Sequence, residues 1–370
     1  MNKTLSLKGL GILIVFLLIS SLVLSGCSNI RQGENTAAKS ETSEEKIISR
    51  ENPDENPETS PNPVPEPVEP LIKNPVRCPL DGQIVEKDSV ERRPLAVMVE
   101  NHPKARPQSG LNKADIVYEA LVEGGISRFM PIYLHNDVDR IGPVRSSRHY
   151  YLDIVLEYNA IYAYFGGSPK AWEDIPKLGV EGLNGIYDGL TYWRDDARKI
   201  PHNVYTTTTK IRAGAERKGF AKQKPMRKFD FSDEPYKPGG AKADEVEIVY
   251  SPFNYTVKYI FDEEAGTYKR YMDGKPHTDA ETGEQLQAKN IIIQYAKTNV
   301  IDSEGRLDIR LVGKGDGLYI TNGYSEKITW EKKSRPSKTV FYDEEGKEIK
   351  LNPGQTWIQI VTLKTRVEIK

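Results

Sequence analysis

Short apolar runs in the first half of the folded part of this chain predict β-strands. Residues 95–99 predict a buried strand that delivers residues 100–102 at its carboxyl end. Two further runs, residues 116–122 and 126–134, flank Gly124-Gly125 and therefore predict a β-hairpin. Residues 160–165 predict one more strand.

Helical spacing appears between and after these runs. Ser146 or Ser147 can cap a helix that reaches about Tyr158, because residues 152, 155 and 156 form one apolar stripe. Ser168-Pro169 opens a second helix, with proline at its first position.

A third helix is predicted near the end of this region. Thr208 or Thr209 caps it and Gly219 closes it, after a short strand at residues 203–206. Alternating strands and helices predict a mixed α/β domain over residues 77–235.

Beyond the turn-rich residues 235–240, helical spacing disappears. The strand-like segments that follow are separated by glycine-rich, aspartate-rich and proline-rich turns. They are residues 245–250, 255–261, 267–272, 290–295, 307–312, 317–321, 325–330, 339–342 and 356–361. We therefore predict an antiparallel β-rich domain over residues 243–370 and an α+β fold class for the chain.

The amino-terminal segment has the pattern of a secretory signal peptide. Lys3 and Lys8 precede an apolar run at residues 10–24, which is too short for an ordinary spanning helix. The run ends at Leu24-Ser25-Gly26-Cys27, which resembles the lipobox of bacterial lipoproteins. The resemblance implies cleavage after residue 26, lipidation of Cys27 with acyl chains such as palmitate, and a membrane anchor on the extracytoplasmic face.

Residues 27–76 are predicted to be a solvated tether. From Ser28 to Val76 there are ten acidic and five basic residues, and eight prolines fall between Pro53 and Pro75. The formal charge of the chain is −1, so subtracting +2 for the signal peptide and −5 for the tether leaves +2 for residues 77–370. This near balance argues against a nucleic-acid partner.

Cysteine content excludes a disulfide framework. The chain has two cysteines, and with Cys27 lipidated, Cys78 has no partner in the chain. A lone cysteine is more often a small buried apolar residue than a reactive thiol, so we assign Cys78 no role. The sequence has no phosphate-binding Walker loop, no His-Glu-x-x-His and no cysteine pair for zinc, and we expect no resident metal or cofactor.

A candidate ligand site lies at Gly142–His149. If this segment opens the helix that ends near Tyr158, then Arg145, Ser146, Ser147 and Arg148 surround free backbone N–H groups, which is how proteins bind phosphate or carboxylate. The alternative is a capped helix whose arginines pair with neighbouring acids such as Asp153. Arginine is unfavourable at a helix amino end unless an anion compensates it.

A second polar segment covers residues 194–203. His202 and Asn203 could complete the ligand site, while Asp195 or Asp196 could bind a divalent cation or act as a general base. A solvated loop with surface ion pairs is the alternative. Two further expectations concern neighbouring side chains. Arg128 and Glu119 should form a cross-strand pair. Aromatic residues in this region should be core or rim rather than a sugar-binding face: Trp172, Tyr192 and Trp193.

Several separated motifs resemble those of the YerB-like lipoproteins, bacterial surface proteins whose domains carry no established function. The resemblance covers nearly all of the chain after the tether and implies a mixed α/β domain followed by a β-rich one. The motifs are Arg93-Pro94-Leu95-Ala96-Val97-Met98-Val99-Glu100-Asn101, Ala114-Asp115-Ile116-Val117-Tyr118-Glu119, Gly142-Pro143-Val144-Arg145-Ser146-Ser147-Arg148 and Pro201-His202-Asn203-Val204-Tyr205.

A local resemblance points to a second family. Residues 159–167, with Leu178-Gly179-Val180 after a helix, are similar to a stretch of the LytR-CpsA-Psr phosphotransferases. That family attaches anionic polymers to peptidoglycan and holds a lipid pyrophosphate with arginines and a metal-binding aspartate. Its Ile-Pro-Arg-Asp segment is missing here, and only the stretch with Arg145 and Arg148 could stand in its place, so the likeness is an analogy.

We therefore expect an envelope lipoprotein whose first domain binds an anionic cell-wall component through Arg145, Arg148 and His202. The alternative is an enzyme of envelope phosphoryl or glycan chemistry that uses Asp195 or Asp196 with a divalent metal. The two differ in whether a carboxylate and the arginines share one site.

Overall fold

The computed structural model describes residues 72–251 and 255–370. The predicted signal peptide, Cys27 and nearly all of the predicted tether lie outside these residues. All of the described residues belong to one compact unit. Within the described ranges, no helix is long and apolar enough to span a bilayer.

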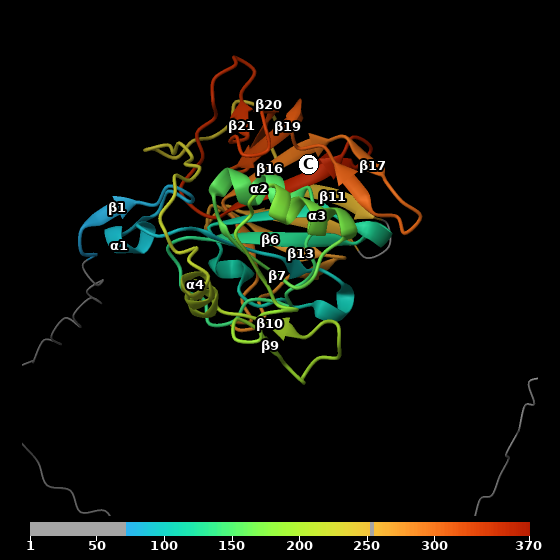
Figure 1. Ribbon diagram of the computed structural model, residues 1–370. Coiled ribbons are helices and arrows are strands. Elements are labelled where there is room, and N and C mark those ends of the chain that lie inside the picture. Colours follow the sequence, from blue (N-terminus) through green and yellow to red (C-terminus); the bar gives the residue numbers. More distant parts are fainter. Residues whose placement is uncertain (1–71, 252–254) are drawn as a thin grey trace, which may run out of the picture. The chain divides into compact units, whose positions relative to one another are not determined.

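A mixed sheet of eleven strands dominates the structure (Figure 1). In spatial order its strands are β21 (Val340–Tyr342), β20 (Tyr324–Lys332), β19 (Gly313–Thr321), β16 (Asn290–Ala296), β22 (Thr356–Thr362), β5 (Ile116–Leu121), β6 (Ser127–Tyr133), β3 (Leu95–Val97), β7 (Ile161–Tyr164) and β8 (Gly182–Asn184), with β4 (Val99–Glu100) also paired to β6.

The two sequence regions share this sheet. Strand β22 from the second region lies between β16 and β5 and is parallel to both. The pairs β3–β7 and β7–β8 are also parallel, while β5 and β6 form the antiparallel hairpin predicted around Gly124-Gly125. The mixed sheet with helices therefore continues from the first region into the second without an edge between them.

A second, antiparallel sheet comes entirely from the second region. Its strands are β14 (Lys275–Pro276), β13 (Thr267–Met272), β12 (Tyr255–Asp262), β11 (Glu245–Ser251) and β23 (Arg366–Ile369), with β15 (Gln287–Ala288) paired to β13. Along β11 the burial alternates residue by residue, because one face of this sheet packs on the core. This confirms the predicted fold class, a mixed α/β part followed by a β-rich part.

The remaining elements are short. Three two-stranded ribbons pair β1 (Pro75–Arg77) with β2 (Ile84–Glu86), β9 (Trp193–Arg194) with β10 (Val204–Tyr205), and β17 (Thr298–Val300) with β18 (Leu307–Ile309). The helices are α1 (Lys87–Val90), α2 (Tyr151–Tyr158), α3 (Pro169–Lys177) and α4 (Thr208–Arg217), with 3-10 turns η1 (Pro103–Ala105), η2 (Leu111–Lys113) and η3 (Glu123–Gly125).

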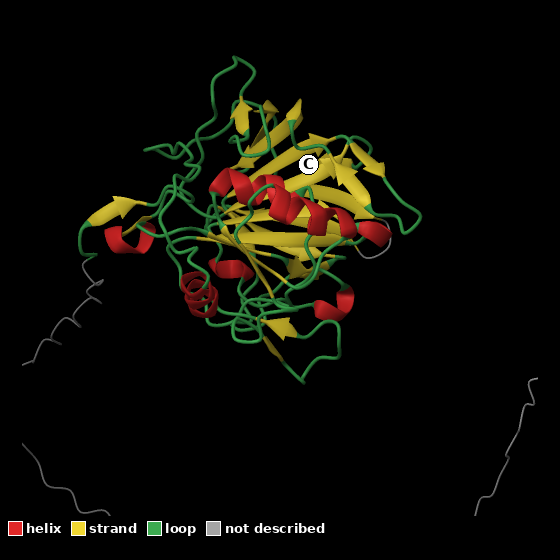
Figure 2. Cartoon of the chain, in the orientation of Figure 1, coloured by secondary structure: helices red, strands yellow, loops and turns green. Residues whose placement is uncertain are grey.

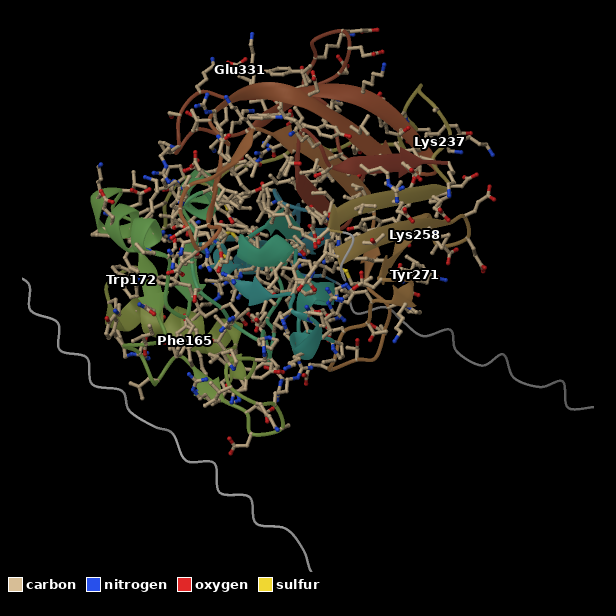
Figure 3. All side chains as sticks on the ribbon, turned by 90° about the vertical axis from the view of Figure 1, so that its right-hand side faces the viewer. Phe165, Trp172, Lys237, Lys258, Tyr271 and Glu331 are labelled. Carbon is tan, nitrogen blue, oxygen red and sulfur yellow. The ribbon has the colours of Figure 1, made fainter. Side chains whose placement is uncertain are left out.

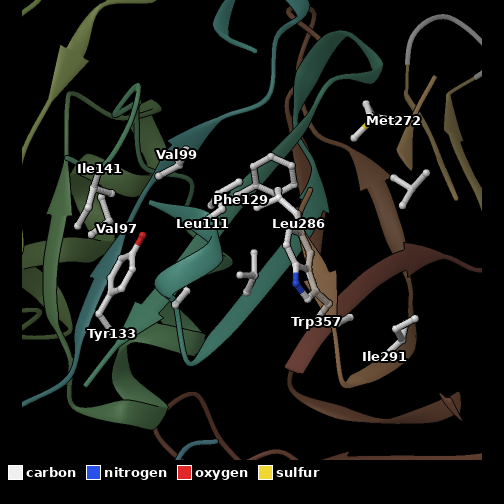
Figure 4. Packing of buried hydrophobic residues seen from close by; sticks show 14 of the residues in the cluster. Val97, Val99, Leu111, Phe129, Tyr133, Ile141, Met272, Leu286, Ile291 and Trp357 are labelled. Carbon is white, nitrogen blue, oxygen red and sulfur yellow. The ribbon is translucent and has the colours of Figure 1, made fainter. Parts of the chain in front are cut away.

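The large sheet is buried on both faces. Val97 packs in a core that includes residues of the second sheet, whereas its neighbour Ala96 packs in the core that contains Leu152 and Val155 of α2. Figure 2 shows α2 and α3 crossing in front of the strands. On the other face, Phe129 meets Trp357 edge to face at 5.8 Å between ring centroids, among the residues drawn in Figure 4. The sequences of the central strands are therefore nearly continuous apolar runs, because both faces of these strands are buried.

Two helices begin close to where the sequence predicts them. Ser168 caps α3, because its side chain accepts a hydrogen bond from the backbone N–H of Ala171 and Pro169 follows it. Helix α4 is capped one residue earlier than predicted, by Thr207, whose side chain accepts from Lys210 N–H.

The prediction for α2 is wrong at its start. The helix begins at Tyr151, its N-cap residue Tyr150 makes no side-chain capping bond, and residues 142–149 precede it in a non-helical conformation. Neither Ser146 nor Ser147 is the cap. The reason is tertiary, since the backbone of Ser147 hydrogen-bonds to Gly166 and Ser168, in the segment after β7, instead of winding into a first turn.

The expected Arg128–Glu119 pair is also wrong. In the β5–β6 register Glu119 lies opposite Phe129, and Arg128 lies opposite Ala120. Adjacent residues of a strand point to opposite faces, so this register separates the two side chains. Glu119 pairs with Arg270 of β13 instead, at 2.7 Å, and both side chains are fully buried.

Candidate functional site

Residues 142–148 run in an extended conformation beside strand β4. Val144 forms a bridge with Val99, Glu100 N–H donates to Pro143 O at 2.9 Å, and Arg145 N–H donates to Met98 O at 2.9 Å. On its other side the segment bonds to the end of β7, where Phe165 N–H donates to Arg145 O at 3.0 Å. Arg145 is therefore fixed between two strands of the large sheet.

Gly142 permits this close packing. Its φ is +151°, and a Cβ there would lie 2.7 Å from the carbonyl oxygen of Val204. Any side chain would push β10 away from the segment, and with it the neighbouring residue His202.

Glu100 joins the two predicted site motifs. Arg145 Nε lies 3.1 Å from Glu100 Oε1, and His202 Nδ1 lies 2.9 Å from Glu100 Oε2. The glutamate is buried, whereas the side chains of Arg145 and His202 are 27% and 12% exposed. We call Glu100, Arg128, Arg145, His102, His202 and Tyr255 the Glu100 cluster.

Arg128 adds a buried positive charge to this cluster. It is the cross-strand partner of Glu100, it is 5% exposed, and one of its terminal nitrogens donates to Ser146 O. Its Nε is buried without a hydrogen-bond partner, and it forms no ion pair with any carboxylate of the described residues. Burial, together with the nearby Arg148 and Arg145, lowers the pKa of Arg128 to about 10, and Glu123 opposes this fall.

The two imidazoles of the cluster are stacked. The rings of His102 and His202 are 4.7 Å apart and 18° from parallel. Nδ1 of His102 accepts from Lys104 N–H at 3.2 Å, so the proton of a neutral His102 ring lies on Nε2. Burial lowers the pKa of His102, and His202 lowers it further, which favours this neutral form.

Tyr255 reaches the cluster from the second sheet. Its hydroxyl is buried with no hydrogen-bond partner among the described residues. Burial raises the pKa of Tyr255 to about 12, and the guanidinium of Arg106, which lies over the ring at 5.0 Å, opposes the rise. The cluster thus holds three buried polar atoms that make no hydrogen bond within the described residues: Arg128 Nε, the Tyr255 hydroxyl and Arg145 Nε, of which the last forms the ion pair with Glu100.

The remaining residues of the first motif bond elsewhere. Arg148 forms a bidentate ion pair with Glu123, with Nε 2.8 Å from Oε2. Ser146 Oγ donates to Phe165 O at 3.0 Å, and Ser147 Oγ accepts from the Tyr162 hydroxyl at 2.8 Å. Asp153, the acid considered as their partner, pairs with Arg335.

The residues of the second motif separate in the same way. Asn203 is buried and its Oδ1 accepts from Arg194 at 2.7 Å. Asp195 pairs with Arg140 and its Oδ1 accepts from Ala197 N–H at 2.8 Å, while Asp196 is exposed. The structure therefore brings Arg145 and His202 together but gives Arg148, Asn203 and Asp195 other partners.

The aromatic residues of this region are core and rim. Tyr192 is 5% exposed and its hydroxyl donates to Leu183 O at 2.6 Å. Trp172 is 37% exposed and projects at the edge of the molecule in Figure 3, on the side opposite Lys258 and Tyr271.

The sequence places residues 100–102 at the end of a strand without indicating a role for them. It suggested Arg128 only as a partner of Glu119, and nothing in it singled out Tyr255. Glu100 and His102 stand at the carboxyl end of a buried strand, which is a signal that could have singled them out. Nothing in the sequence places Tyr255 near them, because it comes from the other sheet.

Comparisons with known proteins match both parts of the chain. Residues 80–221 match the family model "Protein of unknown function (DUF3048) N-terminal domain", and residues 246–358 match the corresponding C-terminal domain. A protein of Bacillus subtilis (strain 168) with the name "Putative lipoprotein YerB" is 39% identical over 289 residues, which are 77% of this chain and 86% of that protein.

A solved structure shows the same fold. The crystal structure of YerB protein from Bacillus subtilis aligns with a TM-score of 0.72 and 36% identity. The alignment covers 79% of this chain and 99% of that one.

Proposed function

Since the chain belongs to the YerB-like family, whose two DUF3048 domains are of unknown function, we propose that it is a lipid-anchored protein of the extracytoplasmic membrane face that binds an anionic envelope component. The name of the Bacillus subtilis relative and the Leu24-Ser25-Gly26-Cys27 motif support the anchor at Cys27. The Glu100 cluster supports the anionic ligand.

The observation that carries this proposal is the unbalanced charge at Arg128. Arg148 and Arg145 lie close enough to lower the pKa of Arg128. Glu100 is paired with Arg145 and Glu123 with Arg148, so neither carboxylate forms an ion pair with Arg128. A buried charge without a partner is costly, because removal from water is not compensated by attraction. An anionic oxygen bound beside Arg128 would supply the missing charge.

The neighbouring groups suit such a ligand. Arg145 is partly exposed, so it can contact a ligand from the solvent side, and Arg128 supplies a buried guanidinium in the same cluster. The neutral His102 offers an Nε2–H donor, and the Tyr255 hydroxyl offers another. Charge-assisted bonds from guanidinium to phosphate or carboxylate are the strong polar contacts in proteins.

Metal-assisted phosphoryl or glycan chemistry through Asp195 or Asp196 has weaker support. Asp195 is already bonded to Arg140 and to a backbone N–H, and within the described ranges no ion pair links either aspartate to Arg145. The carboxylate that shares a site with Arg145 is Glu100, which also orients His202, and this pairing would serve proton transfer if the ligand were also a substrate.

Thermal unfolding of residues 68–370 tests the binding proposal. We expect pyrophosphate or a wall-derived polyanion to raise the melting temperature, by an amount corresponding to about 2.7 kcal/mol when the ligand is at 100 times its Kd. Arg128→Gln and Arg145→Gln should each weaken binding by about tenfold to a hundredfold, because each removes a charge-assisted bond worth about 1.5–3 kcal/mol.

Arg335→Gln is the matched control. Its side chain is 29% exposed, close to the 27% of Arg145, and it pairs with Asp153 and Asp174, which are not members of the cluster. This variant should lose intrinsic stability yet keep the full gain from the ligand. An equal gain in all four proteins, or no gain in the wild type beyond that given by sodium chloride at equal ionic strength, would contradict an anion site at the Glu100 cluster.

A further inference from the structure

Four side chains with metal-ligating atoms meet at the open end of the β5–β6 hairpin, opposite its η3 loop. They are Cys78, Asp81, Asp115 and His135, and their ligating atoms all lie within 4.8 Å of one another. His135 Nε2 is 2.9 Å from Asp81 Oδ2 and 3.2 Å from Asp115 Oδ1, and Cys78 Sγ is 3.4 Å from Asp115 Oδ1. Cys78 and Asp115 are fully buried, and the His135 side chain is 9% exposed.

The fold builds this group from three separate segments. Asp115 directly precedes β5, and His135 follows the end of β6, so the antiparallel hairpin brings both to one end. Cys78 and Asp81 come from a tight turn in which Gly82 N–H donates to Cys78 O at 3.0 Å. Gly82 has φ +75°, and a Cβ there would lie 2.5 Å from the ring of Phe231, so the turn requires glycine.

Backbone groups orient both carboxylates. Asp115 Oδ2 accepts from Leu134 N–H at 2.7 Å, and Asp81 Oδ1 accepts from Gln83 N–H at 3.2 Å. Each aspartate therefore uses one oxygen for the backbone and turns the other toward His135 Nε2. Such supporting bonds are typical of the residues around metal ligands, where they fix the direction of the ligating atom.

We propose that Cys78 Sγ, Asp81 Oδ2, Asp115 Oδ1 and His135 Nε2 bind one zinc ion or a similar divalent transition metal. A thiolate with an imidazole selects such metals over calcium or magnesium, which prefer oxygen ligands alone. Zinc bonds of about 2.0 Å to N and O and about 2.3 Å to S place tetrahedral ligands about 3.3–3.5 Å apart. Three of the six separations between these atoms are 2.9, 3.2 and 3.4 Å, and all six are within 4.8 Å, so small shifts of the side chains would bring the four atoms to tetrahedral spacing.

The predicted role is structural. Four protein ligands in a buried place leave no open position for substrate, as in closed zinc sites. The ion would tie the turn at residues 78–81, which is the first part of the chain after the tether to enter the core, to the end of the central hairpin. Binding ionises the thiol of Cys78, and its proton leaves to solvent.

This proposal is independent of the anion site. Arg128 lies at the start of β6 and His135 beyond its end, and the strand from Arg128 to Tyr133 alone spans about 17 Å at ~3.4 Å per residue. Failure of either site would leave the other untouched.

Metal content and a cobalt spectrum test the zinc site. Residues 68–370, purified without a metal-affinity tag and dialysed against Zn²⁺, should retain one equivalent by elemental analysis. With Co²⁺ in its place, the protein should show the intense visible bands of tetrahedral cobalt and a thiolate-to-cobalt charge-transfer band in the near ultraviolet. Cys78→Ser should lose the charge-transfer band, and His135→Gln should bind Co²⁺ at least about 100-fold more weakly.

His149→Gln is the matched control. The His149 side chain is 6% exposed and contacts Asp308 at 2.8 Å, which is similar to the setting of His135, but it lies outside the group. This variant should keep the metal stoichiometry and the spectrum. Less than about 0.1 equivalent of zinc in the wild type would overturn the proposal in favour of a metal-free hydrogen-bonded network. A cobalt spectrum of the wild type without the thiolate band would show that Cys78 is not a ligand. This measurement does not depend on whether any variant folds.

Discussion

The buried ion pair between Arg270 and Glu119 should be among the most sensitive points of the fold. Arg270 Nη2 lies 2.7 Å from Glu119 Oε2, and both side chains have no exposed surface. Glu119 also accepts from Ser127 Oγ at 2.6 Å, while the Arg270 guanidinium lies 4.6 Å from the centre of the Trp357 ring. The pair links β13 of the second sheet to β5 of the large sheet.

Removing the arginine alone leaves a carboxylate buried without a counter-charge. Loss of one partner of a buried pair typically costs about 3–5 kcal/mol, so we expect Arg270→Met to lower the free energy of unfolding by about that amount. Adding Glu119→Gln should restore at least half of the loss, because an amide oxygen still accepts from Ser127 and no charge remains.

Urea unfolding of residues 68–370, followed by tryptophan fluorescence and circular dichroism, measures these differences. Arg366→Met is a control on the surface, where Arg366 is 61% exposed and lies 3.1 Å from Glu247, and it should cost less than about 1 kcal/mol. If Arg270→Met costs no more than this control, or if the double variant is less stable than Arg270→Met, then Glu119 is not held as a buried anion and the reasoning is refuted.

Two further predictions concern a buried histidine and the anchor. Burial, and then the charges of Arg270 and Arg106, hold the pKa of His277 well below its ordinary 6.5, so the unfolded chain binds a proton that the folded one does not. The free energy of unfolding should therefore fall as pH drops below 6.5, by up to about 1.4 kcal/mol per pH unit. In urea unfolding, His277→Gln should remove this part of the pH dependence. The same pH dependence in the variant and the wild type would contradict a neutral His277. Cys27→Ser should abolish metabolic lipid labelling and leave uncleaved precursor, whereas continued labelling would show that another residue is acylated.

Local patterns were sufficient to predict most elements. The β5–β6 hairpin, α3 with its Ser168 cap and the run of strands after residue 243 all follow from short-range signals that the structure keeps. Each of these depends on residues that are neighbours in sequence, such as a cap and the N–H three residues on. The start of α2 failed because residues 142–148 gain hydrogen bonds from β4 and the end of β7, and no sequence pattern records those partners.

Long-range pairing explains the other differences. The sequence suggested facing side chains for Glu119 and Arg128, but register in a hairpin depends on the loop, and here the loop of η3 sets Leu121 opposite Ser127. A shift of one residue moves every side chain to the other face. The motifs around Arg145 and His202 could each be recognised as polar segments, whereas their common partner Glu100 depends on the path of residues 142–148 along β4.

The β-rich part completes the first part and does not stand apart from it. Strand β22 fills the place beside β5 in the large sheet, and Tyr255 of the second sheet brings its hydroxyl to the Glu100 cluster. A fragment ending before residue 243 would expose the β5 edge, leave Glu119 without Arg270 and remove Tyr255 from the cluster. Because the polar groups that motivate the anion site come from both sequence regions, a ligand bound there would contact the two together. The proposed anion site therefore requires both sequence regions.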